Sequence, residues 1–273
     1  MARSTIPSPL QTVDRALQML TLFTPLCPEL TVAQAARELG VHRSIASRLL
    51  AALEARQFVT QDSETGRFRP GVRNLDLGAL YLQSHRLVTA ATPYLEQLGN
   101  NEKLVLRANL FILDSGQALR LASYPARPLT RIRLPAQCTA AGKVLLSALS
   151  ERALEGVLAE RGLPPQTAHS ITDPNVLRQC LSEVRLRGYA TEAEESNLGG
   201  YCYSAPIRDV AAHTVGAVSV SCSAAGPLPD VEAIRLIEAV CEAGGRISEC
   251  LGSGYLSATA ASGAWGTTAK AGG

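Results

Sequence analysis

Apolar residues between Leu30 and Leu53 recur three and four positions apart, which predicts two α-helices separated by a turn. Thr31 precedes the first helix and can cap its free backbone N–H groups. Gly40 follows the last apolar residue of that helix and permits a tight reversal of the chain. The pattern therefore predicts a helix–turn–helix. The inward stripe expected for its second helix is Val41, Ile45, Leu49, Ala52 and Leu53.

The opposite side of the second helix is polar. At about 100° per residue, Arg43 and Ser47 lie roughly opposite Ile45. Ser44 and Arg48 flank this pair. Guanidinium and short hydroxyl groups on an outward face suit phosphates and base edges in a major groove. For this stretch alone, a soluble helical hairpin whose arginines only keep it hydrated is the alternative.

The residues that follow favour DNA binding. Val59–Gln61 and Arg67–Arg69 flank the polar loop DSETG and together read as a β-hairpin. Alternation along the second strand places Phe68 on one side and its two neighbouring arginines on the other. Such a hairpin directly after such a helix looks like the wing of a winged helix–turn–helix. The candidate DNA-binding residues are Thr31, Arg43, Ser44, Ser47, Arg48, Arg67 and Arg69.

The remaining pattern predicts four segments. A winged domain, with a first helix capped at Thr12, covers residues 1–71. Residues 72–98 form a long helical linker that is apolar on two sides, so we expect it to have two neighbours. One neighbour is its own domain and the other a second subunit, with burial inside one domain as the alternative. Residues 99–251 alternate strand-like and helix-like stretches, which indicates an α+β or α/β domain. Residues 252–273 are small and polar and are expected to be disordered.

Composition narrows the class of protein. The 273 residues are 46% hydrophobic and carry a formal net charge of +2, in line with a globular chain of two domains. Residues 1–73 hold nine Arg against six acidic residues, a modest bias toward polyanions. The seven Cys form no CxxC pair or metal-type spacing, so we expect reduced thiols, no metal and no cofactor. We find neither a leader nor an apolar run of about 18 residues, and expect a cytoplasmic protein without a membrane span.

Three places in the second domain combine polarity with expected burial. A small-residue loop, TAAGK at 139–143, enters a helix whose free N–H groups could attract an anion. The strand 217–223 alternates serines with apolar residues. The Gly-rich stretch EESNLGGYCYSAPI precedes a strand that carries Cys202 and Ser204 on one face. For the loop at 139–143, the alternative is ordinary close packing of small residues. For the strand 217–223, it is the ordinary alternation of a sheet with one solvent-exposed face.

The order of these features resembles the IclR family of bacterial transcriptional regulators over residues 10–251. LTVAQAARELGVHRSIASRLLAALEARQFV resembles the family's helix–turn–helix, GRFRPG its wing, and TAAGKVLLSALS its effector-site loop. The resemblance implies a winged DNA-binding domain, a linker helix used in dimerisation and a GAF-like effector-binding domain. It also implies a homodimer or homotetramer on a palindromic operator, controlled by a small carboxylate effector. The effector-binding residues that it implies are Ala141, Gly142, Glu192, Cys202, Ser219 and Ser221.

Departures from the family pattern and rival functions accompany this expectation. Glu192 stands where the family often has Asp, and Ser204 replaces an Ala. A redox regulator using Cys202 or Cys222 would need a depressed thiol pKa. A hydrolase would need Cys202 paired with His169 or His213 as its base. We therefore predict a regulator and not an enzyme.

Overall fold

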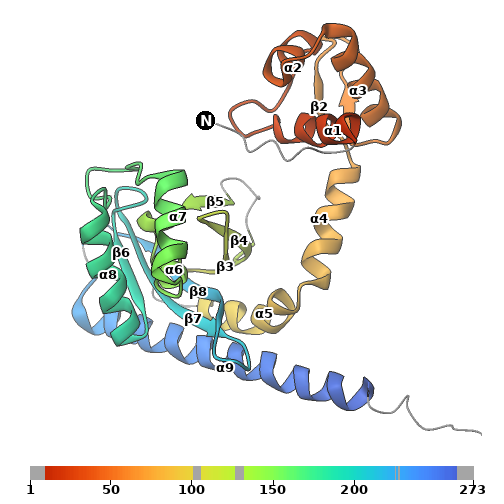
Figure 1. The fold of residues 1–273 in the computed structure, drawn as a ribbon. Coiled ribbons are helices and arrows are strands. Elements are labelled where there is room, and N and C mark those ends of the chain that lie inside the picture. Colours follow the sequence, from red (N-terminus) through yellow and green to blue (C-terminus); the bar gives the residue numbers. More distant parts are fainter. Residues whose placement is uncertain (1–9, 101–105, 127–131, 225, 227, 263–273) are drawn as a thin grey trace, which may run out of the picture. The chain divides into compact units, whose positions relative to one another are not determined.

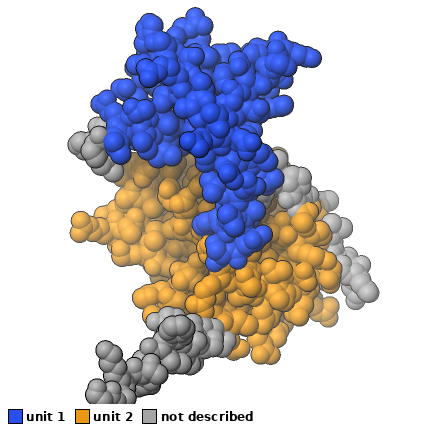
Figure 2. All heavy atoms as spheres, turned by 90° about the vertical axis from the view of Figure 1, so that its right-hand side faces the viewer, with its two compact units in different colours: residues 1–84 blue, residues 85–273 orange. Residues whose placement is uncertain are grey.

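A computed structural model describes residues 10–100, 106–126, 132–224, 226 and 228–262, with side chains up to residue 252. The chain divides into two compact units, residues 1–84 and 85–273 (Figures 1 and 2). The first unit contains α1 (Gln11–Thr21), α2 (Val32–Leu39), α3 (Arg43–Ala55), β1 (Val59–Gln61), β2 (Phe68–Pro70) and α4 (Arg73–Ser84). It has the helix–turn–helix and hairpin that the sequence predicts.

Local signals set the helix–turn–helix as expected. Thr31 and Gln34 form a reciprocal capping box, in which the Gln34 amide donates to the Thr31 hydroxyl at 3.2 Å. The Thr31 amide in turn donates to Gln34 Oε1 at 2.9 Å. Gly40 ends α2 in the left-handed conformation, with φ of 63°.

The structure of this unit corrects the predicted inward face of α3 and the predicted start of α1. Ala46, Leu49 and Leu50 are the buried residues of α3, whereas Ile45 is 38% exposed. Small Ala46 shares a cluster with the alanines of α2, so close approach of the two helices turns this side of α3 inward. Helix α1 begins at Gln11, before the expected cap at Thr12.

The second unit is a six-stranded antiparallel sheet with helices on both faces. Its strands lie in the order β5-β4-β3-β8-β7-β6. They are β3 (Arg107–Asp114), β4 (Gln117–Tyr124), β5 (Arg133–Pro135), β6 (Ala190–Ala193), β7 (Gly200–Arg208) and β8 (Thr214–Ser223). The other elements are α5 (Arg86–Gly99), the 3₁₀ turn η1 (Ala136–Cys138), α6 (Ala140–Ser147), α7 (Glu151–Arg161), α8 (Pro174–Arg187) and α9 (Asp230–Ser262).

The helices sort by sheet face (Figure 1). Helix α9 packs on β7 and α5 on β3, and Gly244 of α9 lies against the side chains of Ala205 and Val218. Helix α6 covers the other face, where its alanines share a cluster with Phe111 and Ala217. Helices α7 and α8 pack outside α6 through a second cluster. The predicted architecture, a winged helix–turn–helix followed by a sheet-and-helix domain, is confirmed.

Two predicted boundaries need correction. The linker expected at 72–98 is two helices, because the backbone of His85 is extended and interrupts the helical hydrogen bonds between α4 and α5. The tail expected at 252–273 begins inside α9, which continues to Ser262 through a stretch with three alanines, the best helix former. Residues 263–273 lie outside the described residues.

The capping box gives a first test. Thr31→Ala removes the acceptor for the N3 amide of α2 and should lower the free energy of opening of α2 by about 0.5–2 kcal/mol. Thr12→Ala is the matched control, because Thr12 lies inside α1 and Ala is the better helix former. Hydrogen exchange of the full chain, followed in peptides from α1 and α2, measures both. Equal protection of α2 in the two variants would contradict the assignment.

Candidate DNA-binding face and effector pocket

The candidate recognition helix α3 presents its predicted polar residues outward. Arg43, Ser44, Ser47 and Arg48 are all exposed, whereas Ala46, Leu49 and Leu50 of the same helix are buried. His42 caps the helix, and its Nδ1 lies 2.9 Å from the Ser44 hydroxyl. The N-terminal half of α3 therefore carries two guanidinium groups and two hydroxyl groups on one accessible face, as a major-groove helix requires.

Thr31 has a different position from these four residues. Its hydroxyl accepts from the Gln34 amide and donates to Gln34 Oε1 at 3.0 Å, so both of its functions serve the capping box. A role in DNA binding stays a prediction for Thr31. In the structure, Thr31 is the N-cap residue that determines where α2 begins.

The hairpin is ordered by hydrogen bonds in its loop. Asp62 Oδ1 accepts from the amides of Glu64 and Thr65 at 3.0 and 2.8 Å, and these bonds, with Thr65 foremost, lower the pKa of the Asp62 carboxyl. Phe68 is buried, whereas Arg67 and Arg69 are exposed. The predicted alternation of the hairpin is confirmed.

A backbone bridge joins the hairpin to the start of the helix–turn–helix. The amides of Leu30 and Phe68 each donate to the other's carbonyl, both at 2.8 Å. Leu30 immediately precedes the cap of α2, and both apolar side chains of the bridge are buried. The wing is therefore hydrogen-bonded to the body of the domain on the side opposite its own partner strand.

In the second unit, strand register brings distant polar residues into rows on the face covered by α6. Glu192 pairs with Cys202, Cys202 with Ser221, and Ser221 with Arg107, which gives one row across four strands. A neighbouring row contains Ser204, Ser219 and Asn109. We call the first set, from Glu192 to Arg107, the outer row and the second set the inner row. Residues separated by about 100 positions in sequence thereby line one surface.

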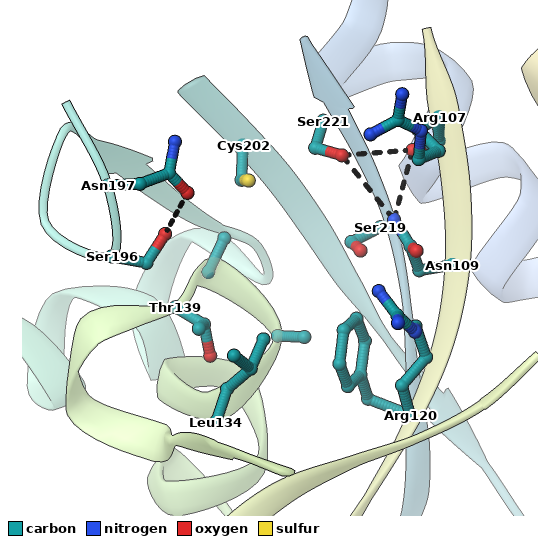
Figure 3. Close-up of a pocket in the computed structure, with 13 residues that line it drawn as sticks. Arg107, Asn109, Arg120, Leu134, Thr139, Ser196, Asn197, Cys202, Ser219 and Ser221 are labelled. Atoms are coloured by element: carbon teal, nitrogen blue, oxygen red, sulfur yellow. Dashed lines mark hydrogen bonds between the residues drawn. The ribbon is translucent and has the colours of Figure 1, made fainter. Parts of the chain in front are cut away.

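A cavity of about 240 Å³ lies over these rows (Figure 3). Four of the six predicted effector residues line it, namely Ala141, Cys202, Ser219 and Ser221. Nine further residues line the cavity. Four of them lie in the two stretches that the sequence singles out, namely Thr139, Ala140, Ser196 and Asn197. The other five are not predicted from the sequence, namely Arg107, Asn109, Phe111, Arg120 and Leu134. The alternation of Arg107, Asn109 and Phe111 along one strand was the available signal. Arg120 is brought to the cavity by pairing with Phe111, which that alternation could not indicate.

Gly142 does not line the cavity. Its amide donates to the Thr139 hydroxyl at 2.9 Å, which caps α6 and uses the N–H group that was assigned to a ligand. A Cβ at this position would lie 2.1 Å from the carbonyl oxygen of Ala136. Gly142 therefore permits close packing of α6 on η1, and a direct ligand contact at this residue stays a prediction.

Glu192 also lies behind the cavity wall. It is 3% exposed, and its Oε1 accepts from the amides of Glu195 and Ser196 at 2.7 and 3.0 Å. Buried Lys143 completes the cluster by donating to the Thr191 carbonyl at 3.2 Å and to Glu195 Oε1. Burial raises the pKa of Glu195, against the influence of Lys143. The carboxylate of Glu192 thus orders the loop that carries Ser196 and Asn197 to the cavity.

The cysteines do not support the two thiol-based functions. Cys202 pairs with Ser221 and Cys222 with Tyr201, so the two thiols lie on opposite faces of the sheet and cannot form a disulfide with each other. Burial, together with the nearby Glu192 carboxylate, raises the pKa of Cys202 well above its ordinary value. A thiol of this kind is protonated at neutral pH and is a poor nucleophile or redox sensor.

The histidines proposed as bases have other partners. His169 Nε2 lies 3.9 Å from Glu194 Oε2, and His213 Nδ1 lies 3.6 Å from Asp209 Oδ2. Over the described ranges, side chains of His, Cys, Asp and Glu form no group that could ligate a metal ion. No helix in these ranges is both long enough and apolar enough to cross a bilayer.

Comparison with known proteins agrees with both units. Residues 12–63 match the IclR helix-turn-helix domain, and residues 79–249 match the C-terminal domain of bacterial IclR transcriptional regulators. The chain is 28% identical over 250 residues to the HTH-type transcriptional regulator XynR of Escherichia coli K12, covering 89% of this chain and 98% of that protein.

Solved structures show the same fold. A protein from Rhodococcus sp. RHA1 matches with a TM-score of 0.74 and 28% identity, over 88% of this chain and 98% of the other. An IclR homologue from Microbacterium hydrocarbonoxydans, solved in complex with 4-hydroxybenzoate, matches with a TM-score of 0.72 and 22% identity. It covers 88% of this chain and 98% of its own, and at that identity it supports the fold alone.

The family models together span both units, and the one for the C-terminal domain alone covers more than half of the chain. Relatives in this family are named as transcriptional regulators and repressors, which are not enzymes. With an exposed second helix of the helix–turn–helix in one unit and a cavity lined in part by polar residues in the other, the protein belongs to the IclR family of bacterial transcriptional regulators, with a helix–turn–helix domain and an effector-binding domain.

Proposed function

We propose that this regulator binds a palindromic operator as a homo-oligomer and that a small organic acid in the cavity controls the binding. The observation that carries the proposal is the exposed face of α3, on which Arg43, Ser44, Ser47 and Arg48 gather. Arg67 and Arg69 of the hairpin supply phosphate or minor-groove contacts beside it. The chain would act in the cytoplasm, where bacterial DNA is found.

The cavity supports an acid as the effector. Its lining combines hydroxyl groups, backbone N–H groups at the start of α6, and two guanidinium groups. A carboxylate accepts hydrogen bonds from such donors, and those from charged donors are the stronger ones. The bound 4-hydroxybenzoate of the Microbacterium hydrocarbonoxydans homologue is an acid of this kind.

The linker supports an oligomer. No residue of α4 is buried, and its exposed apolar side chains include Leu75 at 69% and Leu80 at 59%. Burial of α4 by its own domain, one of the expected arrangements, is thus not seen within the described chain. A helix with this much exposed apolar surface is stable in water when a second copy covers it. The same helix continues the chain from the wing toward the effector domain, so it can couple ligand binding to the pairing of two DNA-binding units.

A substitution of Arg43 tests whether operator binding and ligand binding belong to different units. Arg43→Ala should lower affinity for an operator, selected from random duplexes with the wild-type protein, by about 1–3 kcal/mol, because a base-edge or phosphate contact is lost. Arg56→Ala, at the far end of α3, removes the same charge and should have a much smaller effect. Gel-shift titration measures operator binding. Calorimetry of a carboxylate ligand should give the same affinity in all three proteins, and parallel loss of both activities would refute the proposal.

The linker surface is tested by oligomeric state. Leu75→Glu should raise the dimer dissociation constant at least about tenfold, because an apolar side chain worth about 1.5–3 kcal/mol on burial becomes a charge in the interface. Gln83→Glu adds the same charge to an exposed polar position of α4 and should leave assembly nearly unchanged. Sedimentation equilibrium distinguishes the two. A Leu75→Glu protein that sediments like the wild type would exclude α4 from the interface.

A further inference from the structure

The amide group of Asn109, in the inner row, uses its two N–H donors within the protein. Asn109 is 5% exposed and is one of the residues that line the cavity. Its Nδ2 donates to the Arg107 carbonyl at 3.1 Å and to the Ser221 hydroxyl at 3.5 Å. A side-chain amide has two N–H donors and one carbonyl acceptor. Both donors of Asn109 therefore have partners in the protein.

The carbonyl oxygen of the same amide differs from its nitrogen. Asn109 Oδ1 is buried and makes no hydrogen bond within the described chain. Arg107 and Arg120 also line the cavity, but they take part in other interactions and donate no hydrogen bond to this atom. Exchanging the amide oxygen and nitrogen would not help, because the oxygen would then face the Arg107 carbonyl, which can only accept. The unpaired atom is therefore an acceptor.

This acceptor indicates the chemistry of the ligand group that would pair with it. Buried polar atoms are rarely left without a partner, because the lost hydration is not replaced. An ionised carboxylate has no proton to donate, so the carboxylate of an acid effector cannot pair with Asn109 Oδ1. A group with an O–H or N–H bond can. An acid that satisfies the cavity therefore needs a second polar group, which donates a hydrogen bond.

The residue beside Asn109 distinguishes between the possible donors. Ser219 is the cross-strand partner of Asn109, is 3% exposed and also lines the cavity. Figure 3 shows the two side chains next to each other. The Ser219 hydroxyl can donate as well as accept. A ligand hydroxyl can accept from Ser219 while it donates to Asn109, whereas an ammonium group can only donate. The pair of side chains therefore matches a hydroxyl group.

We propose that the effector is a hydroxylated carboxylic acid whose hydroxyl group binds between Asn109 and Ser219, donating to Asn109 Oδ1 and accepting from the Ser219 hydroxyl. This inference rests on the proposed function and adds a second recognition group to its acid ligand. The apolar side chains of Phe111 and Leu134 also line the cavity, so the carbon skeleton of the acid has a surface to pack on. The volume of about 240 Å³ restricts the acid to a small molecule. Asn109 and Ser219 then select against the deoxy form of the same acid.

Calorimetry of the full-length protein with matched pairs of acids tests the inference. Lactate, 3-hydroxybutyrate and the 3- and 4-hydroxybenzoates are compared with propionate, butyrate and benzoate, which lack only the hydroxyl group. A deoxy acid would leave Asn109 Oδ1 without a donor, so at least one hydroxy acid should bind about 10–100-fold more tightly than its partner. The 3- and 4-fluorobenzoates fill the place of the hydroxyl group without a proton to donate, and should bind like benzoate. Because the hydroxyl group is uncharged, the preference should be equal at low and high salt.

Two variants assign the preference to the proposed pair of side chains. Asn109→Leu removes the acceptor and should lower the affinity for the preferred hydroxy acid about 10–100-fold, while its deoxy partner stays within about twofold. Asn175→Leu makes the same change at an exposed position of α8, outside the cavity, and should bind both acids as the wild type does. Ser219→Ala removes a single oxygen atom and should reduce the preference about 3–10-fold. Thermal melting of each variant without ligand verifies that it is folded.

The outcomes separate this inference from the proposed function. Equal affinity for the members of every pair overturns the hydroxy-acid inference and leaves an acid effector in place. A fluorobenzoate that binds as tightly as the preferred hydroxybenzoate also overturns it, because the cavity would then select size and not donation. So does an equal loss of both acids in Asn109→Leu, which would make Asn109 a structural residue only. Absence of binding by every acid in the wild-type protein overturns the inference and the acid effector together. The comparison of pairs in the wild type and the Ser219→Ala variant stand even if Asn109→Leu fails to fold.

Discussion

The backbone register of four antiparallel strands is the constraint on which the effector domain depends. Ladders between β6, β7, β8 and β3 place Glu192, Cys202, Ser221 and Arg107 in one row. A slip of one residue in β8 would replace its serines at the cavity with Val218 and Val220. Those valines are fully buried on the other face, where α9 packs. Apolar burial on one side of the sheet thereby fixes the position of polar groups on the other.

The polar residues beneath the cavity are largely satisfied by the protein itself. Ser204 donates to the Val218 carbonyl at 2.8 Å, and Ser221 donates to the Arg107 carbonyl at 3.3 Å. The Glu192 carboxylate accepts hydrogen bonds from two loop amides. Each bond offsets the cost of burying a polar group, and together they hold the floor in one arrangement. A ligand would therefore meet a preorganised surface, which lowers the entropic cost of binding.

How far the sequence could predict this molecule depends on whether a signal is local. The cap at Thr31, the left-handed Gly40 and the buried Phe68 between exposed arginines follow from nearest neighbours in the chain, and all are found. The break at His85 has no Gly or Pro to mark it, so a continuous helix was expected. Distinguishing the inward face of α3 required knowing that α2 would approach at Ala46, which periodicity does not specify.

The candidate cavity shows the same limit. Four of its lining residues follow from the family resemblance, and Ser219 and Ser221 also follow from strand alternation. Arg120 needs the pairing of β3 with β4, and this pairing contains an irregularity between Leu110 and Phe111 that no local pattern indicates. Gly142 and Glu192 were identified as important, but the sequence could not tell a residue that touches a ligand from one that orders its neighbours.

The backbone bridge between Leu30 and Phe68 has a consequence for how an operator is chosen. Phe68 separates the two exposed arginines of the hairpin, so its attachment to the start of α2 keeps them at a constant offset from the recognition helix. On an operator bound as proposed, this fixed offset would make the arginine contacts depend on the width of the groove beside the bases that face α3. Flanking A-tracts, which narrow the minor groove, would then alter affinity without any direct contact to their bases.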